Sequence, residues 1–211
     1  MDLTIMRGRL RRDLHDEDAA NYRWTDAELD RHIEHAVREL SLACPLEAKA
    51  TLTTTAGSRD LSLLILDDLV SIEAVEYPVG CYPPCYVRFA VWQDTLTLLV
   101  DDAPAGEESV VLYYSRLHSI DAVSSTVPAP FEDVIVDGAA GYAALEWASF
   151  STNRVNAGGR DVWREYLAWG QERLASFRAA LARYGRRNAV RARRLYTPAG
   201  PARGQSTVIG P

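Results

Sequence analysis

The sequence predicts an α+β fold: a bundle of about four helices, interrupted by a small antiparallel β-sandwich or barrel module and followed by an extended C-terminal arm. Three observations support this. Both flanks of the chain repeat apolar residues at helical spacing, the middle contains short β-branched and aromatic runs, and the end is rich in arginine. The expected boundaries are 1–44 and 122–184 for the two halves of the helical domain, 45–121 for the inserted β-module and 185–211 for the arm.

The first helical half is the most regular part of the sequence. Thr25 and Glu28 match a capping box, in which the Thr25 hydroxyl accepts from the Glu28 amide and the Glu28 carboxylate accepts from the Thr25 amide. Pro45 follows this helix and helps to stop it. An earlier helix is expected from Asp2 to His15. The apolar stripes of the two helices are Leu3, Met6, Leu10 and Leu14, and Leu29, Ile33, Ala36, Val37 and Leu40.

The middle of the chain predicts about five or six antiparallel strands, between about Ala50 and Ser115. The runs VSIEAVEY, YVRFAVW, TLTLLV and SVVLYYS are rich in β-branched and aromatic residues. Segments that contain proline, glycine or aspartate separate these runs and predict turns.

Helical spacing returns after residue 121. Pro130 suits the first turn of a helix, and the run GAAGYAALEWAS is crowded with small residues that let another helix approach closely. A long final helix is expected to open at Asp161 and to end at Gly185. The tail that follows contains PAGPARG, which cannot build a core and is expected to be disordered without a partner.

The charge of the C-terminal tail contrasts with that of the whole chain. The formal net charge is −6, yet the stretch from Arg183 to Gly204 contains seven arginines and no acidic residue. Such asymmetry suggests that the tail meets an acidic partner. Nucleic acid, another protein or an acidic surface on a second copy of the chain would each suit it.

One cluster of side chains could hold a metal ion. His32, His35 and Glu39 follow one another at helical spacing, and Glu28 lies one turn before His32. The favoured alternative is a polar helix face that is solvated or contacts another subunit, because no motif supplies a third ligand. We therefore expect no metal here.

The remaining chemistry of the sequence favours a protein without catalysis or cofactor. The odd number of cysteines leaves no full disulfide framework, and Cys81 and Cys85 lack the C-x2-C spacing of zinc knuckles. We expect these two and Cys44 to be buried or partly buried free thiols. Phosphate-binding and nucleophile-elbow motifs are missing from the sequence. It has neither a signal-peptide pattern nor an apolar run long enough for a bilayer, so no membrane partner is expected.

Three segments follow one another in an order that is typical of one protein family. YRWTDAELDRHIEHAVRELS has an aromatic residue, Thr-Asp-x-Glu-Leu, an aliphatic helix and a closing Arg-Glu. TLTTTAGSRDLSL follows as a strand and a turn, and PAPFEDVIVDGAAGYAALEWAS has Phe-Glu-Asp before an alanine-rich run. Together, from about Leu3 to Tyr184, they resemble the head–tail connector, or adaptor, proteins of tailed bacteriophages, in the form that carries an inserted β-module.

The resemblance implies a structural virion protein. Such adaptors form a homo-oligomeric ring, usually twelvefold, beneath the portal protein, and they dock a stopper or tail protein on the opposite side. Genomic DNA would pass through the ring without sequence-specific contact, which an acidic body favours. The protein would be located in the neck of the virion, and in the host cytoplasm during assembly.

The resemblance also implies that the C-terminal segment reaches out and clasps the portal. The residues expected to contact the partner are Arg183, Arg186, Arg187, Arg191, Arg193, Arg194, Leu195, Tyr196 and Arg203. The terminal STVIG is β-prone and is expected to add a strand to a neighbouring protein. Two alternatives remain at this point: a nucleic-acid-binding module that uses the basic tail directly, and an enzyme built on His32 and His35.

Overall fold

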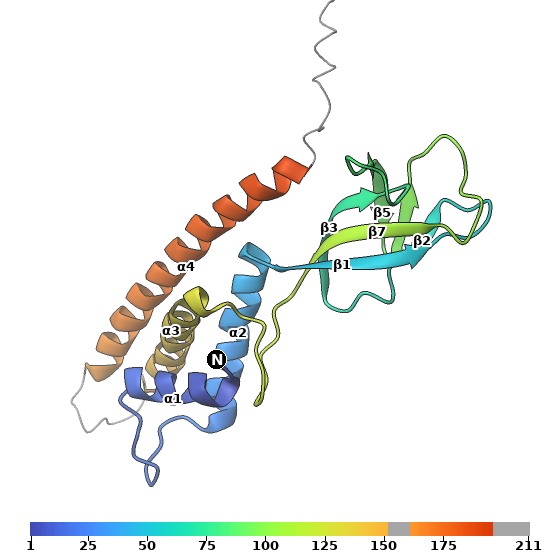
Figure 1. Cartoon of the computed structure of the whole chain (residues 1–211). Helices are drawn as coiled ribbons and strands as arrows, with labels where there is room; N and C mark the ends of the chain where they lie inside the picture. Colours follow the sequence, from blue (N-terminus) through green and yellow to red (C-terminus); the bar gives the residue numbers. More distant parts are fainter. Residues whose placement is uncertain (152–160, 196–211) are drawn as a thin grey trace, which may run out of the picture. The chain divides into compact units, whose positions relative to one another are not determined.

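A computed structural model describes the backbone of residues 1–151 and 161–195, and the side chains of residues 1–151 and 161–185. The chain divides into two compact units (Figure 1). Met1–Pro45 and His118–Arg186 form a helical unit, whereas Leu46–Leu117 lie in a second unit built of strands. The described residues contain four α-helices and two antiparallel sheets, which confirms the α+β prediction.

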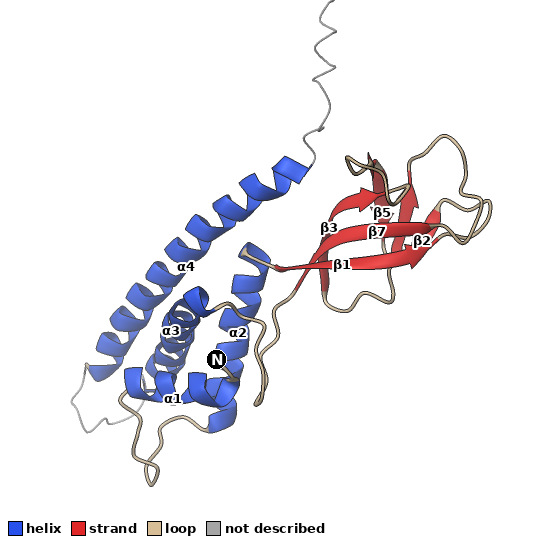
Figure 2. Ribbon diagram, in the orientation of Figure 1, coloured by secondary structure: helices blue, strands red, loops and turns tan. Residues whose placement is uncertain are grey.

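The helical unit contains α1 (Leu3–Asp13), α2 (Asp26–Ala43), the 3₁₀ turn η1 (Ala129–Phe131), α3 (Glu132–Ser151) and the start of α4 (Val162–Leu195), coloured blue in Figure 2. The capping box is present: the Thr25 hydroxyl accepts from the Glu28 amide, and the Glu28 carboxylate accepts from the Thr25 amide at 2.7 Å. Asp2 caps α1 by accepting from the Ile5 amide at 2.9 Å. Within the described ranges, no helix combines the length and hydrophobicity that crossing a bilayer requires.

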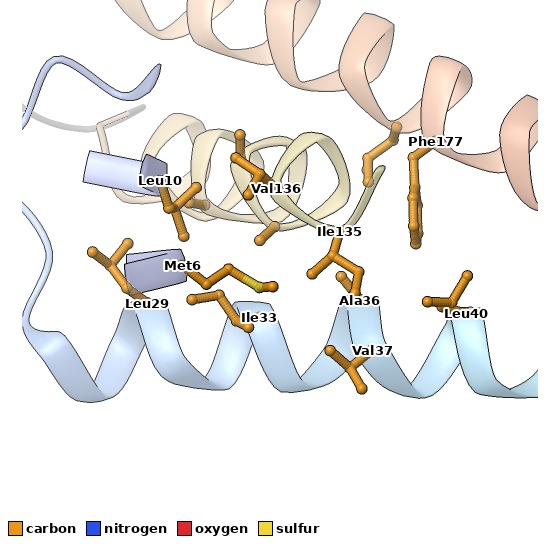
Figure 3. Close-up of a cluster of buried hydrophobic side chains, with 14 of the residues drawn as sticks. Met6, Leu10, Leu29, Ile33, Ala36, Val37, Leu40, Ile135, Val136 and Phe177 are labelled. Atoms are coloured by element: carbon orange, nitrogen blue, oxygen red, sulfur yellow. The ribbon is translucent and has the colours of Figure 1, made fainter. Parts of the chain in front are cut away.

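All four helices contribute to one apolar core (Figure 3). The fully buried large side chains of this core are Met6 and Leu10 of α1, Leu29, Ile33 and Leu40 of α2, Ile135 of α3 and Phe177 of α4. They come from the stripes at helical spacing, because only one face of each amphipathic helix can leave water. Each such side chain contributes about 1.5–3 kcal/mol through burial.

Small residues let α3 and α4 pack closely. A Cβ at Gly141 would lie 2.7 Å from Leu174 Cγ and 3.1 Å from the Gly170 carbonyl oxygen. A Cβ at Gly170 would lie 3.1 Å from Ala144 Cβ and 3.1 Å from the Gly141 carbonyl oxygen. The two backbones therefore approach each other so closely that a side chain at either position would force its neighbours to shift.

The second unit has two antiparallel sheets, coloured red in Figure 2. Its strands are β1 (Leu46–Thr53), β2 (Asp60–Ser62), β3 (Leu69–Glu76), β4 (Tyr86–Val87), β5 (Phe89–Trp92), β6 (Thr95–Leu98) and β7 (Ser109–Arg116). The sheet orders are β1-β7-β3-β4 and β2-β6-β5. Side chains from both sheets fill one core: Leu52, Leu61, Leu63, Val75, Leu96, Leu98, Val110 and Leu112. This confirms the prediction that the middle of the chain forms a small antiparallel β-sandwich or barrel.

The strands differ in detail from the prediction. There are seven strands in this unit, and β1 begins at Leu46 rather than near Ala50. Glu47 and Lys49 obscured its start, since charged residues have low strand propensity. Both side chains are exposed, and they alternate with the more buried Leu46, Ala48 and Ala50. Pairing with β7 over its whole length extends β1 to Leu46.

The final helix does not end at Gly185, as the sequence predicted, but continues to Leu195. A glycine inside a helix costs only about 1 kcal/mol relative to alanine, and the alanines, arginines and leucine around it are strong helix formers. A Cβ at Gly185 would lie 3.3 Å from the carbonyl oxygen of Ala43, so this glycine lets α4 pass the end of α2. The extended arm predicted from residue 185 is thus helical as far as Leu195, and residues 196–211 lie outside the described residues.

Replacing Gly141 by valine should lower the free energy of unfolding of the helical unit by about 1–3 kcal/mol, because the new side chain overpacks the contact with Leu174. Gly8→Ala is the matched control. Gly8 lies in α1, where an added Cβ would meet nothing within 4 Å, so this change should stabilise the unit by up to about 1 kcal/mol. Urea unfolding followed by tryptophan fluorescence measures both effects. Equal stability changes in the two variants would contradict close packing at Gly141.

Thr25→Ala should lower the free energy of unfolding by about 0.5–2 kcal/mol, since it removes one half of the capping box. Thr4→Ala, at an exposed position inside α1, should cause no loss. Thermal unfolding by circular dichroism compares the two. If Thr25→Ala unfolds at the wild-type temperature, the capping box does not stabilise α2.

Candidate partner-binding site

The C-terminal arginines lie on the last part of α4, and among them only the Arg183 side chain is described. Arg183 is exposed; its Nη2 donates to the Tyr184 hydroxyl at 3.2 Å, and its guanidinium carbon lies 4.9 Å from the centre of the Tyr184 ring. The other expected contact residues on α4 lie beyond the described side chains: Arg186, Arg187, Arg191, Arg193, Arg194 and Leu195. Tyr196, Arg203 and the terminal STVIG lie outside the described residues altogether.

The helix is anchored immediately before its basic end. Leu174, Phe177 and Leu181 are buried in the helical core. Tyr184 adds an edge-to-face contact with Phe131, with ring centres 4.9 Å apart. At roughly 1.5 Å of rise per residue, the stretch from residue 186 to residue 195 continues the axis by about 15 Å. The arginine positions therefore follow a helix whose base is fixed.

The helical backbone groups the arginine positions. With 3.6 residues per turn, positions 183, 187, 191 and 194 fall on one side of α4, and positions 186 and 193 fall on a neighbouring side. Positive charge near a helix C-terminus also interacts favourably with the helix dipole. Arginine at these positions thus has a structural explanation besides a binding one.

Arg173, an arginine of α4 before the basic stretch, acts inside the helical unit. It forms an ion pair with Asp137 of α3 and lies 3.9 Å from Asp13 at the end of α1. Its guanidinium carbon also lies 5.0 Å from the centre of the Trp169 ring. Its charge is therefore used within the fold, which the sequence could not reveal because the partners are far away along the chain.

The most buried ion pair joins α1 to the segment before α2. Arg11 is only 6 % exposed, and it donates to Asp16 at 2.6 Å, to the Trp24 carbonyl at 3.0 Å and to Asp26 at 2.7 Å. The Tyr22 ring covers its guanidinium at 3.5 Å. A buried charge persists only when it is paired in this way. The hydrogen bond from Arg11 lowers the pKa of Asp26.

The histidine face of α2 is covered by α3. His32 is buried, and its Nε2 lies 2.6 Å from a carboxylate oxygen of Glu146. His35 stacks on Tyr142 with ring centres 4.2 Å apart, and its Nε2 lies 3.3 Å from Glu39. The prediction of a solvated or subunit-contacting face is therefore wrong for His32. Among the described side chains, no group of three or more His, Cys, Asp or Glu is arranged to hold a metal ion.

Burial and pairing set the ionisation of this face. Burial lowers the pKa of His32 by more than the hydrogen bond to Glu146 raises it. Partial burial raises the pKa of Glu146, but hydrogen bonds from Arg31 and His32 outweigh it and leave the pKa below its usual value. Burial, and next the hydrogen bond to Glu39, raise the pKa of Tyr142 to about 12. At neutral pH Glu146 is therefore a carboxylate beside the neutral imidazole of His32, and Tyr142 is a phenol that donates to Glu39.

The cysteines differ from their prediction in part. Cys44 is buried at the end of α2, as expected, but Cys81 and Cys85 are exposed. None of the three forms a disulfide. Spacing along the chain could not indicate this exposure, because C-x3-C occurs in buried and in exposed turns alike.

A family model described as SU10 adaptor protein matches residues 1–202. The chain belongs to this family. The match spans the described parts of both units, and it confirms the resemblance to the head–tail connector proteins of phages that the sequence indicated. Membership makes the chain a structural adaptor protein of phage-like virions.

One solved structure similar to this chain is the neck of an empty GTA particle, computed with C6 symmetry. The two share 14 % sequence identity, and the alignment covers 80 % of this chain and 88 % of the other. At a TM-score of 0.28 this likeness carries no structural argument. No curated protein matches the chain.

The helical unit should lose stability on acidification through His32. Because its pKa is lower in the folded state than the unperturbed 6.5, the unfolded state takes up a proton first as the pH falls through about 6.5. The free energy of unfolding should therefore fall from about pH 7.5 to 5.5 more steeply in the wild type than in His32→Gln.

Urea unfolding at several pH values measures these slopes. Thr4→Ala, which changes no titratable group and lies at an exposed position of α1, is the control and should keep the wild-type slope. Identical slopes for wild type and His32→Gln would show that His32 does not carry the pH dependence.

Proposed function

We propose that the chain forms a homo-oligomeric ring, twelvefold as is usual for adaptors of this class, between the portal and a stopper or tail protein. The observation that carries the proposal is the match of the SU10 adaptor family over residues 1–202. The ring extends the DNA channel and has no catalytic role. The protein works in the neck of the virion and is present in the host cytoplasm during assembly.

The distribution of paired arginines supports docking through the basic end of α4. Arg7, Arg11 and Arg173 are each neutralised by carboxylates of the helical unit itself. The described contacts of Arg183 are with Tyr184 and include no carboxylate. These three arginines are thus used internally, whereas those after Arg183 are candidates for an acidic portal surface, to which guanidinium groups bind bidentately.

The acidic character of the chain supports passage of DNA without sequence-specific contact. The formal net charge is −6 although the C-terminal stretch is strongly basic, so the body carries the negative charge. A negatively charged channel wall repels phosphates and lets a duplex slide.

A second candidate function is binding of nucleic acid by the basic tail itself. The seven arginines between Arg183 and Gly204, with no acidic residue among them, favour it. It requires an affinity for DNA that falls steeply as salt increases, because bound arginines release counterions from the phosphates.

Replacing Arg186, Arg187, Arg191, Arg193 and Arg194 together by alanine should weaken docking to the cognate portal by at least about 100-fold, since charge-assisted hydrogen bonds contribute about 1.5–3 kcal/mol each. Electron microscopy of the mixture shows ring–portal complexes, and sedimentation gives their affinity. Arg9→Ala with Arg12→Ala, two exposed arginines of α1, is the matched control and should dock normally.

One further variant, compared with the wild type, separates the candidate functions. The variant in which the same five arginines are replaced by lysine keeps the positive charge but loses the bidentate geometry of guanidinium. It should therefore retain DNA binding better than portal docking. Salt-dependent DNA binding by the wild type, with no ring on the portal under any condition, would favour the nucleic-acid function. Unchanged docking of the alanine variant would show that the basic end of α4 is not the portal contact.

A further inference from the structure

We infer that an exposed apolar patch on the strand unit, made of Leu64, Ile65 and Trp92, docks the tail-side protein of the neck. By tail-side protein we mean the stopper or tail protein of the proposed function, on which this inference rests for the identity of the partner. The patch itself, and the kind of surface that it fits, follow from the second unit alone.

Trp92 lies on the outer face of the sheet β2-β6-β5. Leu61 of β2 pairs with Leu96 of β6, and both are buried in the core of the unit. The next position of β6, Thr95, lies opposite Ser62 on one side and opposite Trp92 on the other. Successive side chains of a strand point to opposite faces, so these three share the face that points away from the core. Trp92 is accordingly 81 % exposed.

Leu64 and Ile65 lie in the turn that follows β2. Leu63 and Leu66 anchor this turn, because Leu63 is buried, Leu66 packs against the same core, and the Leu66 amide donates to the Leu63 carbonyl at 2.9 Å. The Leu63 amide also donates to the carbonyl of Asp94, in the hairpin turn between β5 and β6, at 2.8 Å. The two residues between the anchors stay in water: Leu64 is 72 % exposed and Ile65 67 %.

The three apolar side chains gather at one end of this sheet. Neighbouring strands lie about 4.8 Å apart, so the backbones of Ser62 and Trp92, on either side of β6, are about 10 Å from each other. The Leu64 amide donates to the Ser62 hydroxyl at 3.4 Å, which keeps Leu64 beside the face that carries Trp92. Exposed apolar side chains that cluster in this way mark binding surfaces, and tryptophan is among the residues most enriched at the centres of interfaces.

Acidic residues border the patch. Asp67 and Asp68 follow in the same turn, Asp94 lies in the adjoining hairpin turn, and all three are exposed. Residues 46–117 together have eleven acidic and four basic side chains, a formal net charge of −7. The patch therefore fits a protein surface that is apolar at its centre and basic at its border.

Charge disfavours the other occupants that the neck offers. The acidic border repels the phosphates of DNA. The body of a second copy is acidic as well, since residues 1–45 and 118–185 have thirteen basic and eighteen acidic side chains. In the proposed function the portal surface is also acidic, because it accepts the arginines after Arg183. The tail-side protein is the partner that remains.

The test measures binding of the purified cognate tail-side protein by sedimentation, both to the free chain and to the ring–portal complex. Trp92→Ala, and separately Leu64→Ser with Ile65→Ser, should weaken this binding by at least about 30-fold, because the central residues of an interface carry most of its binding energy. Tyr82→Ala is the matched control. It removes an aromatic side chain that is 99 % exposed in the same unit, but from the loop after β3 instead of the turn before it, and it should bind normally.

A second variant tests the border. Asp67→Asn with Asp94→Asn should weaken binding and make it less dependent on salt, since two attractive charges are lost while the apolar centre is kept. Circular dichroism should show the wild-type unfolding temperature for every variant, because each replaced side chain is exposed.

Three results would overturn the inference: a wild type that binds no tail-side protein in either form, unchanged binding by Trp92→Ala, or self-association of the free chain that Trp92→Ala abolishes, which would make a second copy the occupant. Portal docking is scored separately, and Trp92→Ala should dock as the wild type does. A wild type that fails to dock on the portal would contradict the proposed function, whereas a docked ring that binds the tail-side protein without the patch would contradict this inference alone.

Discussion

The close approach of α3 and α4 is the constraint on which the helical unit depends. A Cβ at Gly141 would lie 2.7 Å from Leu174 Cγ, and one at Gly170 would lie 3.1 Å from Ala144 Cβ, so either addition would force neighbouring atoms to shift. This contact places Leu174 and Phe177 of α4 in the common core. Because α4 is one continuous helix, the same contact also fixes the axis along which the basic positions follow. The same contact between α3 and α4 therefore serves both the packing of the core and the placement of the basic positions.

Several charged side chains of the helical unit are paired with opposite charges in the same unit. Arg11 is buried between Asp16 and Asp26. The carboxylate of Glu146 in α3 contacts both Arg31 and His32 of α2. Such partly buried pairs contribute modestly to net stability, but removing one partner leaves an uncompensated charge and is costly. They constrain which helix faces which, since Arg11 with Asp26 joins α1 to α2, and Arg31 with Glu146 joins α2 to α3. The proposed docking function assigns the arginines after Arg183 to an acidic partner instead.

The second unit is stabilised by a separate apolar core. Its two small sheets enclose an apolar core of their own, so the unit does not need the helices to bury its strands. Residues 78–85, between β3 and β4, are exposed, whereas Cys44 at the end of α2 is buried in the helical core. Cys44, buried in the helical unit, and the exposed pair of Cys81 and Cys85 illustrate this contrast within one chain.

The sequence by itself determined the fold class, the capping box at Thr25, the order of helices and strands and the family, because these follow from local spacing and from motifs that need no distant partner. Tertiary structure alone decided the rest. It continued α4 through Gly185, buried His32 against Glu146, exposed Cys81 and Cys85, and drew Arg173 into the helical unit. Each of these outcomes depends on which groups meet across the fold, and periodicity along the chain carries no information about partners that lie a hundred residues away.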